Sequence, residues 1–109
     1  MGGATLKNTL LVQFPANTSP AYDRVIEIED ALVQAFKQNR AAVVDGHDFG
    51  GTANIFIFPN GPWDNCIKVV MAYLKLKKAL GEVLVIKRLK SEKYEVVWPK
   101  GFTGDFERV

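Results

Sequence analysis

The sequence contains few of the residues from which catalytic and metal sites are most often built. Its 109 residues include one cysteine and one histidine. A single cysteine, Cys66, excludes an internal disulfide and every zinc site built on paired cysteines. A single histidine, His47, cannot complete a typical transition-metal set. The chain also has no Gly-x-Ser-x-Gly elbow and no phosphate-binding Gly-x-x-x-x-Gly-Lys loop. We therefore expect no metal, no cofactor and a role other than catalysis.

Long apolar runs are also missing. No stretch approaches the roughly 18 apolar residues that a membrane-spanning helix needs, and residues 1–7 lack the charged-then-apolar pattern of a signal peptide. The content of 48% hydrophobic and 24% charged residues is that of an ordinary folded domain. We predict a single cytoplasmic domain over residues 1–109 that does not contact a membrane.

Basic residues are concentrated in the second half of the chain. Lys87 and Arg88, at the end of an apolar run, are the candidates for binding an anion. The alternative is that these lysines and arginines form a solvated face or favour a helix dipole.

Apolar periodicity predicts five strands and two helices. Ser19 and Pro20 match the N-cap and first-turn preferences of a helix that ends near Asn39. Asn60-Gly61-Pro62 opens a second helix, which we expect to end at Gly81. The predicted strands are 9–14, 41–46, 52–59, 82–89 and 93–99.

This order of elements predicts an α+β protein with the ferredoxin-like split βαβ fold. In that arrangement, βαββαβ, two helices cover one face of an antiparallel sheet, and here a C-terminal strand is added at an edge. The fold is common to many unrelated activities, so it does not by itself define a function.

The third predicted strand is apolar on both faces. Ala53, Ile55 and Ile57 alternate with Asn54, Phe56 and Phe58, so phenylalanines point to the face that the helices leave open. An apolar patch of this kind is covered by a second copy of the sheet, by a ligand, by stacked nucleotide bases or by the chain's own tail. Nucleic acid is disfavoured, because residues 51–54 do not match the RNA-recognition motif of this topology.

The tail after Pro99 is predicted to be irregular over residues 99–109. Pro99, Gly101 and Gly104 disfavour a helix there, so aromatic side chains must anchor the segment to an apolar surface. Either the chain's own sheet or a partner supplies that surface, and we expect the partner. The candidate interface residues are Asn54, Phe56, Phe58, Trp98, Phe102 and Phe106.

The stretch between the second and third strands is the candidate functional hairpin. Asp45, His47 and Asp48 stand beside Gly46 and the Gly50-Gly51 pair. Glycines and Asx side chains are typical of a tight turn, with His47 exposed at its tip. The functional alternatives are a partner contact, an acid–base pair or a metal site.

The run from Asp45 to Phe56, between two amphipathic helices, resembles a pattern in small uncharacterised bacterial proteins: Asp-Gly, a polar pair, Gly-Gly and an apolar strand. Some proteins of this kind are immunity partners of secreted bacterial toxins, so the resemblance implies a protein-binding role.

Together these features favour a non-enzymatic protein-association module. We predict a homodimer, or a complex with another protein, through the Phe56 and Phe58 face. The alternative is a small-ligand-binding protein or enzyme that uses Asp45, His47 and Asp48.

Overall fold

The computed structural model describes residues 7–15 and 22–109. The predicted helix start at Ser19 and Pro20 lies outside these residues. In chain order the elements are β1 (Thr9–Phe14), α1 (Tyr22–Asn39), β2 (Ala42–Phe49), β3 (Ala53–Pro59), α2 (Trp63–Leu76), β4 (Leu84–Arg88) and β5 (Tyr94–Trp98).

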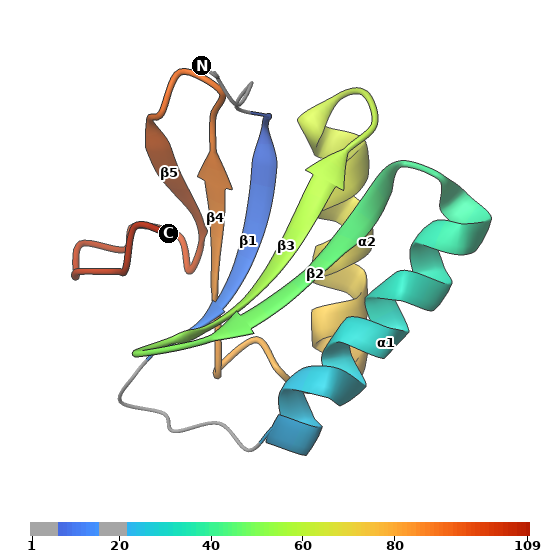
Figure 1. Cartoon of the computed structure of the whole chain (residues 1–109), viewed down its shortest axis with the longest axis horizontal. Helices are drawn as coiled ribbons and strands as arrows, with labels where there is room; N and C mark the ends of the chain where they lie inside the picture. The colour runs from blue at the N-terminus through green and yellow to red at the C-terminus, as the bar shows by residue number, and fades with distance from the viewer. Residues whose placement is uncertain (1–6, 16–21) are drawn as a thin grey trace.

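The five strands form one sheet in the order β2-β3-β1-β4-β5, and every neighbouring pair is antiparallel. Both helices lie on one side of the sheet, and the C-terminal tail lies on the other (Figure 1). This arrangement confirms the predicted ferredoxin-like α+β fold with a fifth strand added beside β4.

The main core lies between the sheet and the two helices. Its apolar side chains come from alternate positions of β1 and β3 and from one face of α1, as the periodicity predicts. Ile55 and Ile57 of β3 point into this core, whereas Phe56 belongs to a smaller cluster on the opposite face. The predicted division of β3 into two apolar faces is therefore confirmed.

The smaller cluster contains the C-terminal tail. Leu11, Leu84 and Ile86 are buried there beneath Phe102 and Phe106. Because both faces of β1 are covered, all six of its residues are buried. The expectation that the tail needs a partner to become ordered is wrong, because the chain's own sheet supplies the apolar surface.

The second helix ends earlier than the sequence predicts. It stops at Leu76 rather than at Gly81, and Lys78 adopts a positive φ of 58°. The Lys78 amide donates to the oxygen of Lys75, and the Ala79 amide donates to the oxygen of Leu74. This is the Schellman pattern of helix termination, formed here around a lysine where glycine is more usual.

Cys66 lies on the inner face of α2 and is fully buried. Burial raises the pKa of its thiol from 9.0 to about 12, because a thiolate is poorly solvated in apolar surroundings. The sole cysteine is therefore a packing residue.

This pKa shift predicts a loss of stability at high pH. The folded state keeps the Cys66 proton that the unfolded state releases, so stability is full below pH 9.0 and falls as the pH rises towards about 12. Denaturant unfolding at several pH values should show a steeper decline for the natural chain than for Cys66→Ala. Parallel declines in the two proteins would contradict this assignment.

No helix in the described part of the chain has the length and apolar character needed to cross a membrane.

Candidate functional site

The stretch expected to form the hairpin turn is instead part of a strand. β2 continues to Phe49, and the reversal occurs at Gly50 and Gly51. Within β2, Val44 pairs with Ile57 and Gly46 pairs with Phe56, so Asp45 is an extra residue in a β-bulge. Gly46 has a positive φ of 153° at this point, a conformation that glycine adopts without steric cost.

The bulge changes which side chains face the helices. Beyond it, His47 pairs with Ile55 and Phe49 pairs with Ala53. Since Ile55 and Ala53 belong to the helix-side core, His47 and Phe49 also point towards the helices. Asp48 pairs with Asn54 and points to the face that carries the tail.

His47 is paired with Glu29 of α1 and is not a free residue at a turn. Its Nδ1 lies 2.8 Å from Oε1 of Glu29, and the exposed fractions of the two side chains are 29% and 11%. Glu29 is therefore a buried residue of α1 and not part of its solvated face. The His47 ring also makes edge-on contacts with Tyr22 and Phe49, whose rings stack with centroids 5.2 Å apart.

The three hairpin candidates therefore do not converge. Asp45 lies in the bulge, His47 faces α1, and the Asp48 carboxylate accepts a hydrogen bond from Asn54 on the opposite face at 3.1 Å. Among residues 7–15 and 22–109, no three His, Cys, Asp or Glu side chains are grouped to hold a metal ion.

The six candidate interface residues are also divided. Phe56 of β3 and Phe102 and Phe106 of the tail pack against the smaller cluster, and Phe58 lies beneath the Lys7 ammonium at 5.1 Å. Trp98 belongs to the opposite face, where its indole N–H donates to the oxygen of Leu80 at 2.7 Å.

The sixth of these residues, Asn54, belongs to a polar network that fixes the tail. Gln13 is fully buried, and its Nε2 donates to Oδ1 of Asn54 and to the main-chain oxygen of Glu107, both at 2.8 Å. The Glu107 amide donates back to Oε1 of Gln13 at 3.1 Å. We did not predict this network from the sequence, although its signal is present there as single amide residues within the apolar runs 9–14 and 53–58.

Lys87 and Arg88 point to opposite faces of the sheet and do not form one anion site. The Lys87 ammonium lies 5.4 Å from the ring centre of Trp63 on the helix side. The Arg88 guanidinium donates to Oγ1 of Thr9 and to the main-chain oxygen of Val109, under the tail.

The most exposed apolar surface of the described residues lies along β2. Four large apolar side chains in this part of the chain are exposed: Tyr22 (59%), Val43 (60%), Phe49 (43%) and Leu76 (70%). The first three lie on β2 or against it. β2 is an outer strand of the sheet, so among the described strands only β3 pairs with it. The main-chain groups on its other side are therefore available to a further strand.

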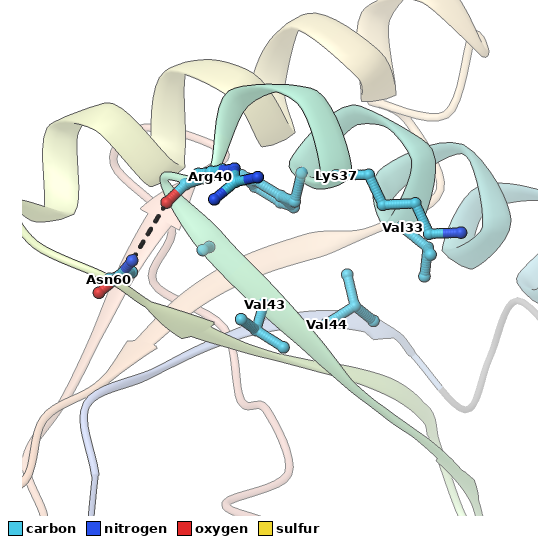
Figure 2. Close-up of a pocket in the computed structure, with 8 residues that line it drawn as sticks. Val33, Lys37, Arg40, Val43, Val44 and Asn60 are labelled. Atoms are coloured by element: carbon cyan, nitrogen blue, oxygen red, sulfur yellow. Dashed lines mark hydrogen bonds between the residues drawn. The ribbon is translucent and has the colours of Figure 1, made fainter.

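A pocket of about 460 Å³ runs between this outer strand and α1. Figure 2 shows Val33 and Lys37 of α1 above it, and Arg40 and Asn60 at the end where α1 passes into β2. Of the two β2 valines that line it, Val44 points towards α1 and Val43 points to the other side of the strand. We call the outer side of β2 together with this pocket the β2 edge surface. Its side chains are Tyr22, Val33, Lys37, Arg40, Val43, Asp45, Asp48 and Phe49, of which Val43 and Asp48 point to the face of the sheet away from the helices.

The charges along the β2 edge surface are segregated. Lys37 and Arg40 lie at the start of β2, because α1 ends there. Asp45 and Asp48 lie in its second half, and all four residues are exposed. One end of the surface is therefore basic and the other is acidic.

In comparison with known proteins, no family model matches the chain, and no curated protein or solved structure matches it significantly.

Proposed function

We propose that this chain is a non-enzymatic protein-association module that forms a homodimer through the β2 edge surface. The observation that carries the proposal is the coincidence of an outer strand with three of the four exposed large apolar side chains. Addition of a strand to such an edge uses main-chain hydrogen bonds for affinity and neighbouring side chains for specificity.

The segregated charges favour a second copy of the chain as the partner. If two β2 strands pair in antiparallel fashion about a two-fold axis, the start of each lies opposite the end of the other. Lys37 and Arg40 of one copy would then lie towards Asp45 of the other, and the same contact would occur twice. Complementary charges of this kind define the register of an interface and disfavour wrong partners.

The proposal replaces the face that the sequence suggested for dimerisation. Phe56 packs against the same cluster as Phe102 and Phe106 of the tail, so that part of the sheet has an intramolecular cover. The cytoplasmic location and the likeness to immunity partners of toxins stay predictions. Both are compatible with a protein that acts by association.

Val43→Asp should weaken the homodimer by about tenfold or more, because it places a charge where we expect an apolar contact between two strands. Light scattering should show a shift from twice the 12.1 kDa chain mass towards the single chain. Leu76→Asp is the matched control, since Leu76 is also an exposed large apolar residue but lies at the end of α2.

Exchange of charges tests the two-fold arrangement itself. Lys37→Glu and Asp45→Lys should each weaken the dimer, and the double variant should recover most of the lost affinity. A natural chain that stays monomeric at high concentration would refute the homodimer. Equal effects of the Val43 and Leu76 variants on dimerisation would show that the dimer does not form through the β2 edge surface.

The alternative function, a ligand or enzyme site at the hairpin, has one supporting contact. The Glu29 carboxylate orients the His47 imidazole at 2.8 Å, as a general base requires. The two aspartates proposed to act with His47 do not point towards it, so we rank this function second.

A further inference from the structure

A second pocket lies on the opposite face of the sheet from the helices. It has a volume of about 640 Å³ and is an open groove between the tail and the sheet. Leu84, Phe102 and Phe106 supply apolar walls, and Gln13 and Thr52 supply polar ones. A site of this size, with apolar walls and a few polar groups, is typical of small-molecule binding.

The polar walls of this pocket are already engaged within the chain. Both ends of the Gln13 amide bond to Glu107 or Asn54, and the Thr52 hydroxyl donates to Oε1 of Glu107 at 3.2 Å. A ligand therefore gains little from these groups. The carboxylate of Asp105 also lines the pocket, and none of the hydrogen bonds or ion pairs of the described residues engages it.

The charge of the lining has one sign. Asp105 and Glu107 are acidic, and none of the described residues that line the pocket is a lysine, arginine or histidine. The Arg108 guanidinium lies beside it, 4.5 Å from the ring centre of Phe106, so one of the two aromatic walls already contacts a cation. Aromatic rings and carboxylates together attract ammonium groups.

We infer that this pocket binds a small organic cation, namely a primary ammonium on an aryl or alkyl body. The body would contact Leu84, Phe102 and Phe106, and the ammonium would lie near Asp105 and Glu107. This site is separate from the β2 edge surface and does not depend on dimerisation.

Titration of the full chain with three probes of the same shape tests the inference. Phenethylamine, phenethyl alcohol and phenylacetate share a phenyl group and differ in charge. Isothermal calorimetry or NMR shifts should show that the amine binds with a dissociation constant of about 1 mM or lower, roughly tenfold more tightly than the alcohol. Phenylacetate should bind most weakly.

Asp105→Asn should weaken amine binding about fivefold to tenfold and leave binding of the alcohol unchanged. Asp105 is exposed, so the variant is expected to fold. Asp64→Asn, an exposed carboxylate in the first turn of α2, is the control and should have no effect. Equal binding of all three probes would contradict the preference for a cation. If none of the probes bound, the pocket would not be a binding site for small organic cations.

Discussion

Deletion of residues 99–109 is expected to lower the free energy of unfolding by about 3–5 kcal/mol. The deletion removes Phe102 and Phe106 from the smaller cluster and uncovers Leu11, Leu84 and Ile86. Full burial of one such side chain contributes roughly 1.5–3 kcal/mol, and these aromatics are only partly buried. The loss of the hydrogen bonds from Gln13 to Glu107 adds to this effect.

Chemical denaturation of the full-length and truncated proteins measures this difference directly, and a hydrophobic dye should bind the truncated form. Lys100→Ala is a control within the tail, because this exposed side chain should contribute less than about 0.5 kcal/mol. The shortened protein should still form dimers through β2. If it kept its stability and lost self-association, the tail would belong to the interface and our assignment would fail.

Gln13→Leu is expected to lower the free energy of unfolding by about 2–4 kcal/mol. Leucine is comparable in size to glutamine and has no donor or acceptor, so the change removes the hydrogen bonds and keeps most of the packing. It leaves Oδ1 of Asn54 and both main-chain groups of Glu107 without their partner. A buried polar group without a partner costs roughly 1–3 kcal/mol.

Deletion of residues 99–109 tests whether the cost of Gln13→Leu comes from its hydrogen bonds to the tail. In the protein that lacks residues 99–109, Glu107 is absent, so Gln13→Leu should cost clearly less than in the full chain. Gln34→Leu, at an exposed position of α1, is the matched control and should change stability by less than about 0.5 kcal/mol. Equal costs in the two backgrounds would show that Gln13 does not hold the tail.

The two proposed sites use different parts of the same sheet. The β2 edge surface is formed by an outer strand and α1, whereas the cation pocket is formed by the tail on the other face. Variants at Val43 and Asp105 can therefore be combined. Each should affect its own measurement only, because residues that share no partners behave independently.

The sequence by itself determined the order of the elements and the fold. Apolar residues three and four apart predicted α1, and the alternation along residues 53–58 predicted both faces of β3. These patterns are local, and each element must bury its own apolar face, so a single sequence is sufficient to recognise them. The early end of α2 at Leu76 was missed because Lys78 adopts a conformation that usually indicates glycine.

Only the tertiary structure decided which functional residues meet. One extra residue at Asp45 turns His47 towards Glu29 and leaves Asp48 on the other face. The alternation of side chains along a strand does not by itself reveal where such an extra residue lies. Gln13 and Glu107 are 94 positions apart, so no local pattern connects them. The cover of the open face was undecided for the same reason, since an apolar tail packs on whichever apolar surface it reaches, and only the three-dimensional path of the chain places that surface within reach.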